Sequence, residues 1–451
     1  AKRTKRSMLR VGVRATRPPA LAIRTASFWK SSSSGTAQPP PPSPAAANEE
    51  MVSISEVEKL LYSGVRAIGY NDSEAQTMRD AMMWAQLRDN NQGIIKLTSG
   101  GLAKSADGVP TVELDSPAGA RVNGNQVMSM VVLDHAVGLA INKAKSASKI
   151  GVVGTFNTAQ SMGACGFYIE KIAKEGLVGI LMATSPEFVA PFGAKQPILG
   201  TNPIACAVPT DRGLMLMDQA TAAFPWFGLL EAKTAGRKIP PDVAYDADGI
   251  PTDDPAKALK GALRTFDRGY KSSNLALMVE LLAGPLVGGA HKDKLTAKNW
   301  GNLVIAIDPA MLGDAATFYR AAGEVLDRVR TAERLPGVTE MVIPGEREAA
   351  KAAARLQQGV LPIEKNMLSE LRALAAQFDD QAASSADSIA ERQTQLIEKL
   401  ISRLDRLEAK MGEAAMTQEK LSQQQQRLET VALESLRSAN GVSAPARGRA
   451  T

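Results

Sequence analysis

Proton-transfer chemistry needs side chains that titrate near neutral pH, and this sequence of 451 residues holds only two histidines, His135 and His291. Imidazole is the usual proton donor at pH 7 because its pKa lies close to that value. His135 lies in a stretch that predicts a helix, where we expect a structural histidine. His291 follows Gly-Gly-Ala in a predicted loop, where we expect solvent exposure. Neither histidine is therefore a favoured catalytic residue.

Three other side chains, Asp218, Lys271 and Cys165, are of types that can take part in acid–base or nucleophilic chemistry. A carboxyl or ammonium group can donate a proton where burial shifts its pKa, so Asp218 and Lys271 are residual catalytic candidates. Asp218 could instead orient a backbone turn, and Lys271 could form a surface ion pair. We expect Cys165 to be a small core residue. Two cysteines cannot build a Cys-based zinc site, and we predict no metal site.

The basic residues are concentrated at the N-terminus. Residues 1–48 contain nine Lys and Arg and no acidic residue, so the rest of the chain carries 44 basic and 47 acidic side chains, a net charge of −3. A nucleic-acid partner therefore has no electrostatic support. The longest apolar stretches are shorter than the roughly 20 residues that a membrane span needs, so we expect no transmembrane segment.

The N-terminal segment has the composition of a mitochondrial transit peptide, because its basic residues alternate with apolar and hydroxyl residues and acidic residues are missing. A disordered basic tail is the alternative. A Pro- and Ser-rich spacer follows, and residues 1–48 therefore form a leader and spacer. This composition predicts a mitochondrial location.

Segments with helical and strand periodicity alternate from residue 52 onward. Residues 53–68, 71–87 and 127–146 show helical spacing, the first two with Ser53 and Asn71 as caps. Short apolar runs at 150–156, 178–184, 204–208, 214–218 and 303–307 predict strands, and 166–175 and 314–333 predict further helices. The alternation predicts an α/β fold with an N-terminal helical part.

The pattern changes near residue 380, where turn residues vanish. Two interleaved apolar series recur every seven residues and predict a coiled-coil helix over 380–440, followed by a disordered tail at 441–451. A single amphipathic helix folded onto its own domain is the alternative. The series are Ile397, Leu404 and Met411, and Leu400, Leu407, Ala414, Leu421 and Leu428.

Six motifs occur in order between residues 199 and 284. They are Leu-Gly-Thr-Asn-Pro-Ile-Ala-Cys-Ala-Val-Pro at 199–209, Asp-Gln-Ala-Thr at 218–221, Gly-Arg-Lys-Ile-Pro at 236–240, Asp-Ala-Asp-Gly-Ile-Pro-Thr-Asp-Asp-Pro at 246–255, Gly-Tyr-Lys at 269–271 and Leu-Ala-Leu-Met-Val-Glu-Leu-Leu-Ala-Gly at 275–284. Together they resemble the type-2 malate/L-lactate dehydrogenase family of NAD(P)-dependent oxidoreductases. The resemblance covers about residues 52–379.

The resemblance implies a non-Rossmann α/β fold and a homodimer with its active site between the subunits. It also implies hydride exchange between nicotinamide and a small 2-oxo or 2-hydroxy acid. No Gly-x-Gly-x-x-Gly follows a predicted strand, which agrees with a non-Rossmann fold. By resemblance, the residues that would bind NAD or NADP are Gly200, Thr201, Asn202, Pro203 and Lys271.

The two histidines that the family carries at its active site are missing. Gln92 replaces the first, in the turn Asn-Gln-Gly, and Ser161 replaces the second. Lys96 stands where the family has an arginine that would clamp a substrate carboxylate. Gly228 stands where it has a lysine.

Two further departures affect the motifs near the cofactor. Ala222 replaces the serine that follows Asp-x-Ala-Thr, and residues 272–274 are Ser-Ser-Asn where the family has Gly-Tyr-Gly. Because added side chains limit the approach of the backbone to a ligand, we expect no cofactor or weak binding.

These departures favour a catalytically inactive dehydrogenase fold that serves as a structural subunit of a mitochondrial assembly. The core would form the homodimer, and the coiled coil would bind a protein partner. An active NAD(P)-dependent oxidoreductase with rearranged proton donors is one alternative. A module that senses nicotinamide nucleotides or metabolites without turnover is the other. The sequence alone leaves enzymatic activity open.

Overall fold

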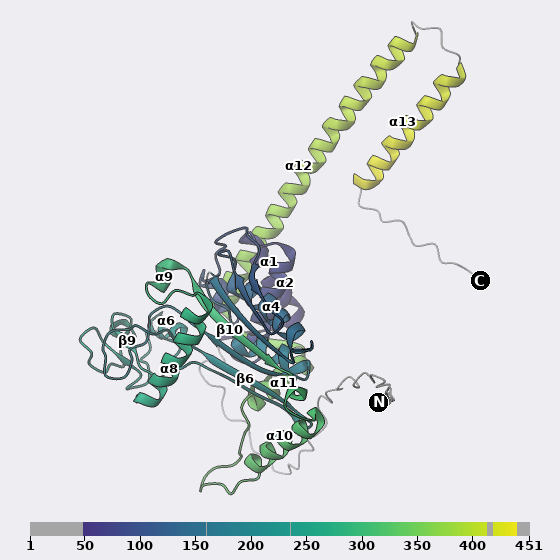
Figure 1. The fold of residues 1–451 in the computed structure, drawn as a ribbon. Coiled ribbons are helices and arrows are strands. Elements are labelled where there is room, and N and C mark those ends of the chain that lie inside the picture. The colour runs from purple at the N-terminus through teal and green to yellow at the C-terminus, as the bar shows by residue number, and fades with distance from the viewer. Residues whose placement is uncertain (1–47, 159, 235, 413–417, 440–451) are drawn as a thin grey trace, which may run out of the picture.

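The computed structural model describes residues 48–412 and 418–439, apart from residues 159 and 235 (Figure 1). The leader predicted at the N-terminus and the tail predicted at 441–451 lie outside the described residues. Within them, none of the helices combines the length and the apolar character that a membrane crossing requires.

A mixed sheet of seven strands forms the centre of the molecule, in the order β2-β3-β4-β10-β5-β6-β7. Strands β3 and β4 run parallel, and the other neighbouring pairs are antiparallel. This mixed order confirms an α/β fold that is not a parallel, doubly wound sheet. In sheet order the strands are Thr111–Asp115, Gly119–Asn123, Ile150–Thr158, Trp300–Ile307, Val178–Ala183, Ile204–Thr210 and Gly213–Gln219.

Side chains of the central strands alternate between two apolar layers, because successive residues of a strand point to opposite faces. Val153, Leu181 and Val304 enter the larger core cluster, which includes residues of helices α4 (Ser129–Ala144) and α5 (Cys165–Lys174). Their neighbours Met182 and Leu303 enter a smaller cluster with helix α8 (Tyr270–Ala283). The sheet is therefore covered on both faces.

Helices α1 (Ile54–Ala67) and α2 (Asp72–Gln86) confirm the N-terminal helical part. The Ser53 hydroxyl accepts a hydrogen bond from the Glu56 amide at the start of α1. Asn71 and Glu74 form a complete capping box at the start of α2. The short helix α3 (Ile95–Thr98) follows.

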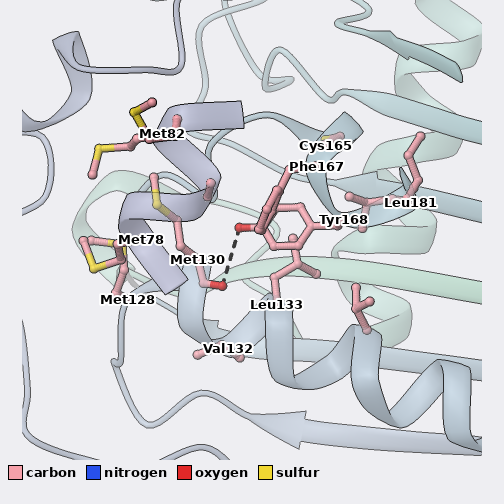
Figure 2. Packing of buried hydrophobic residues seen from close by; sticks show 14 of the residues in the cluster. Met78, Met82, Met128, Met130, Val132, Leu133, Cys165, Phe167, Tyr168 and Leu181 are labelled. Atoms are coloured by element: carbon pink, nitrogen blue, oxygen red, sulfur yellow. Dashed lines mark hydrogen bonds between the residues drawn. The ribbon is translucent and has the colours of Figure 1, made fainter. Parts of the chain in front are cut away.

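The larger core lies between α2, α4 and α5 and is rich in methionine (Figure 2). Figure 2 shows Met78 and Met82 of α2, Met130 of α4 and Tyr168 of α5 among the buried side chains of this cluster. The Tyr168 hydroxyl donates hydrogen bonds to the carbonyls of Met130 and Met162. This fixes the loop that precedes α5.

A second unit is formed mostly by the chain after β7, together with the segment between β5 and β6, and has its own small core. Val189, Leu199, Leu229 and Leu263 belong to this core. The unit contains α6 (Trp226–Thr234), α7 (Pro255–Ala258), the two-stranded sheet of β8 (Ala244–Tyr245) and β9 (Ala262–Leu263), and α8. Helix α9 (Lys294–Ala297) leads back to β10. Because α8 contributes to this core and to the layer on the sheet, it joins the two units.

Helix α10 (Ala315–Arg330) lies at the end of the sheet, and α11 (Glu346–Gln358) leads to β11 (Val360–Glu364). Strand β11 pairs with β1 (Glu49–Ser53), which joins the two ends of the domain.

Helix α12 (Lys365–Gly412) is continuous across residue 380, where the sequence predicted a boundary. Its first turns belong to the core, since Leu368 and Leu371 are buried against α1. The remainder extends far beyond the body of the molecule, and α13 (Gln418–Ala439) contacts it (Figure 1). A coiled coil with another chain stays a prediction, and the side chains of Leu404, Leu407, Met411, Ala414 and Leu421 lie outside the description.

The exposure of one histidine was predicted correctly from the sequence, and that of the other was not. His291 is exposed, as predicted. His135 is also exposed, on the outer face of α4, so its prediction as a structural core histidine is wrong. The helical face that enters the core passes through Leu133, Ala136 and Val137 instead. Cys165 is buried in the core, as expected.

Candidate functional site

Two of the ordered motifs meet at the end of the sheet. The Thr221 hydroxyl donates hydrogen bonds to the carbonyls of Thr201 and Asn202, at 3.0 and 3.1 Å. The Thr221 amide also donates to the Thr201 carbonyl at 2.9 Å. The turn at 199–203 and the motif at 218–221 are therefore held as one unit.

Asn202 is the anchor of that turn. Its φ is +39°, a left-handed conformation that asparagine tolerates better than most residues. Its amide nitrogen donates to the Ala276 carbonyl and to Glu280 Oε2, at 3.1 and 2.8 Å. Glu280 Oε1 accepts from Lys294 Nζ at 2.6 Å, and Lys294 is fully buried. This buried network ties the turn to α8 and α9.

A carboxylate lies at the N-terminus of α8. Asp267 Oδ1 accepts hydrogen bonds from the Gly269 amide, at 2.7 Å, and from the Ser272 hydroxyl. The Ser272 hydroxyl and the amides of Gly269 and Ser272 hold the pKa of Asp267 below its usual value. The first turn of α8 therefore already has an anion of its own, where a helix otherwise favours a bound phosphate.

Asp218, near the end of β7, is part-buried and accepts a hydrogen bond from the Gly166 amide at 2.7 Å. Desolvation raises its pKa to about 6, against the opposing effect of that hydrogen bond. The same carboxylate adds to the burial that raises the pKa of Cys165. Asp218 thus orients the first turn of α5, the structural role considered from the sequence, and also titrates near neutral pH.

Lys96 on α3 is 2% exposed, although lysine is rarely buried without a partner. Its Nζ lies 3.3 Å from the centroid of the Phe227 ring. Burial alone lowers its pKa to about 7. No carboxylate among the described residues pairs with it. The face of an aromatic ring attracts an ammonium group electrostatically, but it does not neutralise the charge as a carboxylate would.

Lys96 is connected to the turn at 199–203 through aromatic residues. Phe227 follows Trp226 at the start of α6, and Trp226 stacks on Phe188 with ring centroids 3.7 Å apart. The Phe188 amide donates to the Leu199 carbonyl at 2.9 Å. The structure thus brings the segments around residues 96, 201 and 221 into one neighbourhood.

The two positions where the family has histidines hold side chains bound to their own turns. Gln92 Nε2 donates to Asn91 Oδ1 at 2.9 Å. The Ser161 hydroxyl accepts from the Gly163 amide at 3.2 Å. Neither side chain titrates near neutral pH, so proton transfer at this site would need other groups.

Lys271 is exposed in the first turn of α8. The neighbouring serines, Ser272 and Ser273, are buried, and the Ser273 hydroxyl accepts from the Phe192 amide at 3.0 Å. Their hydroxyls therefore stabilise the protein itself. At Gly228 no side chain is present to supply a cation, which leaves Lys96 as the buried cation beside Phe227.

A nicotinamide nucleotide, which the resemblance implies, fits one side of this site better than the other. The turn formed by Gly200, Thr201, Asn202 and Pro203 is rigid, because its backbone and the Asn202 amide are fixed by hydrogen bonds. These residues would hold the cofactor. On the α8 side, the negative charge of Asp267 opposes phosphate groups, so we expect weak affinity.

Sequence reasoning missed two features of this site. The burial of Lys96 has no signal in the sequence, because Phe227 lies 131 positions away along the chain. The role of Asp267 could have been predicted from the sequence. An acidic residue shortly before the helix and a serine at the third helical position are typical of a pair that caps a helix.

The comparisons with known proteins agree with this geometry. A family model for malate/L-lactate dehydrogenase matches residues 52–372. A malate/(S)-sulfolactate dehydrogenase of Methanothermus fervidus is 31% identical over 73% of this chain and 98% of its own length. A Δ(1)-pyrroline-2-carboxylate reductase of Pseudomonas fluorescens is 31% identical over 72% of this chain and 98% of its own length.

A solved structure supports the same assignment. The sulfolactate dehydrogenase from Methanocaldococcus jannaschii superposes with a TM-score of 0.64 and 31% sequence identity, over 73% of this chain and 98% of that one.

The mixed sheet and the turns at 199–203 and 218–221 define a non-Rossmann α/β protein of the oxidoreductase type. The chain belongs to the malate/L-lactate dehydrogenase family. The relatives bear the names of working dehydrogenases and reductases. They therefore support the oxidoreductase alternative more than the structural subunit that the missing histidines favoured.

Proposed function

We propose that this chain is an NAD(P)-dependent oxidoreductase that interconverts a small 2-oxo acid and the matching 2-hydroxy acid. Family membership supports the reaction class. The observation on which the proposal rests is that two titratable side chains, Lys96 and Asp218, have pKa values moved toward neutrality by burial. Asp218 begins the motif at 218–221, and Lys96 is connected to the turn at 199–203 through aromatic residues. Groups with pKa values moved toward neutrality cluster at catalytic sites.

The reduction needs a hydride at the carbonyl carbon and a proton at the carbonyl oxygen. A bound nicotinamide supplies or accepts the hydride. The chain itself supplies the cation Lys96 and the carboxyl group Asp218. At pH 7 Asp218 is mostly ionised, since its pKa is about 6, so it suits proton acceptance or orientation better than donation.

The direct test is turnover by the purified full chain. NADH and NADPH oxidation would be followed with oxaloacetate, pyruvate and glyoxylate. We expect slow, saturable oxidation with at least one of them. In Asp218→Asn, which keeps an acceptor for the Gly166 amide but cannot ionise, we expect a lower rate than in the wild type. A wild-type rate no higher than the rate without protein, for every pair, would reject the proposal.

A second candidate function is a structural subunit of a mitochondrial assembly. The observation that favours it is that the side chains at the positions of the family's histidines are bound locally: Gln92 to the Asn91 side chain and Ser161 to the Gly163 amide. The leader composition supports the mitochondrial location, and the projecting α12 would contact the partner. The core would form the homodimer that the family resemblance implies.

Purification of the native protein separates the two functions. A subunit would co-elute with a large complex and show no turnover, whereas the enzyme would elute as a small oligomer with activity. Binding of NADH or NADPH without turnover would instead favour the sensing module.

A further inference from the structure

We propose that Lys96 faces the carbonyl oxygen of the substrate and donates its proton, the task that an imidazole performs where the family motifs keep their histidines. This inference rests on the proposed function and names the donor for it. From the sequence, Lys96 was considered only as a weak replacement for the family's arginine that binds the substrate carboxylate.

Lys96 is buried without a carboxylate partner in the described part of the chain. Its side chain is 2% exposed, and its Nζ rests on the Phe227 ring at 3.3 Å. Lys294, which is also fully buried, pairs with Glu280. The less buried Lys143 pairs with Asp115, and Lys104 pairs with Glu74 and Asp107. Of these four lysines, Lys96 alone has an aromatic face and no described carboxylate partner. A stability role would have favoured an apolar residue here.

Hydrogen bonds hold the backbone of the turn that carries Lys96. The Ile94 amide, at the start of α3, donates to Gln86 Oε1 at 3.2 Å. A Cβ on Gly93 would lie 2.4 Å from the same oxygen, so a larger residue there would displace the Gln86 amide from this hydrogen bond. The Lys96 amide closes the turn by donating to the Gly93 carbonyl at 3.0 Å. A proton donor needs such fixed placement.

No charged group among the described residues offsets the burial of Lys96. Helices α1 and α12 contact α3, and α6 carries Phe227; charged groups on these helices have partners or solvent of their own. Arg66 of α1 pairs with Asp72, Glu231 of α6 pairs with Arg237, and Glu370 of α12 is exposed. The pKa of Lys96 is accordingly lowered by desolvation alone.

The other candidates fit this role less well. Asp218 is bound to the Gly166 amide, an interaction that favours its ionised form. Lys271 is exposed, and burial raises the pKa of Cys165, which keeps its thiol protonated and inert. The Lys96 side chain is shielded from solvent, and its pKa of about 7 allows it to donate a proton near neutral pH.

The step balances as follows. The carbonyl carbon gains a hydride, that is, a proton with two electrons, which a bound dihydronicotinamide would supply as the reductant. As the C–H bond forms, the π electrons of the carbonyl pass to oxygen, which takes a proton from Lys96 Nζ. The products are the 2-hydroxy acid, oxidised nicotinamide and a neutral amine, which regains a proton from water.

The first test compares three variants of the full chain in the turnover assay. Lys96→Met keeps the length but removes the proton. Lys96→Arg keeps the charge but holds its proton too firmly to donate it. We expect both to lose about 100-fold or more in kcat. Lys257→Met, on an exposed lysine, should match the wild type. Wild-type kcat in Lys96→Met would overturn the inference and leave the proposed function intact.

The second test does not depend on turnover. In protein labelled with ¹³C at lysine Cε, the Lys96 resonance is assigned by its loss in Lys96→Met, and its titration is followed with and without oxamate. We expect a midpoint near pH 7 that oxamate, an anionic analogue of a 2-oxo acid, moves upward.

The two tests separate the hypotheses. A wild type without turnover whose Lys96 resonance still responds to oxamate would reject the oxidoreductase and keep Lys96 as a substrate-facing group. A midpoint above pH 9, or no response to oxamate, would overturn the inference.

Discussion

Lys96 shows how a single residue can act against stability in favour of function. Its pKa falls from 10.5 in the unfolded chain to about 7 in the folded protein, which corresponds to as much as about 5 kcal/mol of unfavourable burial below pH 7. We predict that Lys96→Met raises the free energy of unfolding at pH 7 by roughly 2–4 kcal/mol, measured by urea denaturation.

The pH dependence of this gain has a definite sign. Between pH 7 and pH 10 the unfolded chain binds more protons than the folded protein at this residue, so the wild type gains stability as the pH rises. The advantage of Lys96→Met should therefore shrink toward pH 10, and Lys257→Met should show no such trend. A gain that stays constant across this range would contradict the assigned burial.

Asp267 controls how the first turn of α8 meets an anion. Asp267→Asn keeps the acceptor for the Gly269 amide and removes the charge. We predict that it strengthens NADH or NADPH binding roughly threefold to tenfold, because the N-terminus of a helix then attracts phosphate without a competing carboxylate. Calorimetric titration measures the change. Asp314→Asn, at the start of α10, is the control, and an equal gain there would argue against a local effect.

At the scale of elements, the turn at 199–203 depends on a glycine for reasons of packing. A Cβ on Gly200 would lie 2.5 Å from Asn202 Oδ1 and from both oxygens of Ser185. We predict that Gly200→Ala destabilises the protein by about 1–3 kcal/mol, measured by urea denaturation. Gly313→Ala, where no atom lies within 4 Å of the added carbon, should be close to neutral.

Local signals were enough to predict most elements. Ser53 and Asn71 mark the starts of α1 and α2 through capping chemistry that needs no distant residue. The order of the strands was not predictable, because β10 lies between β4 and β5 although about 120 residues separate it from β5. The start of α12 at Lys365 was missed as well, since a helix that passes from a packed core into solvent carries no break in its local pattern.

The first turns of α12 pack against the core, whereas its outer part does not. Leu368, Leu371 and Ala375 are buried against the core, and Arg66 lies over the Phe378 ring at 5.0 Å. We therefore predict that deletion of residues 385–451 leaves a soluble, dimeric core, by gel filtration and circular dichroism. Deletion from residue 365 should instead unfold it, because α1 would lose its apolar partner. Equal behaviour of the two truncations would contradict this division.

At the scale of the whole molecule, the site exists only after the chain has folded. Its segments come from α3, the 199–203 turn, the end of β7 and the start of α6. The order of the motifs along the chain was enough to predict the family, but it could not predict that Lys96 would be buried against Phe227. The sequence also correctly excluded a Rossmann fold, which the mixed sheet confirms. It could not reveal which polar groups would be shielded, since burial is a property of the assembled core.

The outer part of α12 decides between a free enzyme and a subunit. Leu396, Leu400 and Ile401 are 60, 45 and 55% exposed, so replacing all three with glutamine removes no core contact of this chain. We predict that the triple variant folds normally but elutes as a smaller native particle when it is purified from its source by gel filtration. Leu312→Gln, on an 88% exposed residue of the body, should leave the particle size unchanged. A triple variant that elutes with the wild type would show that this face holds no partner, which would favour the free enzyme.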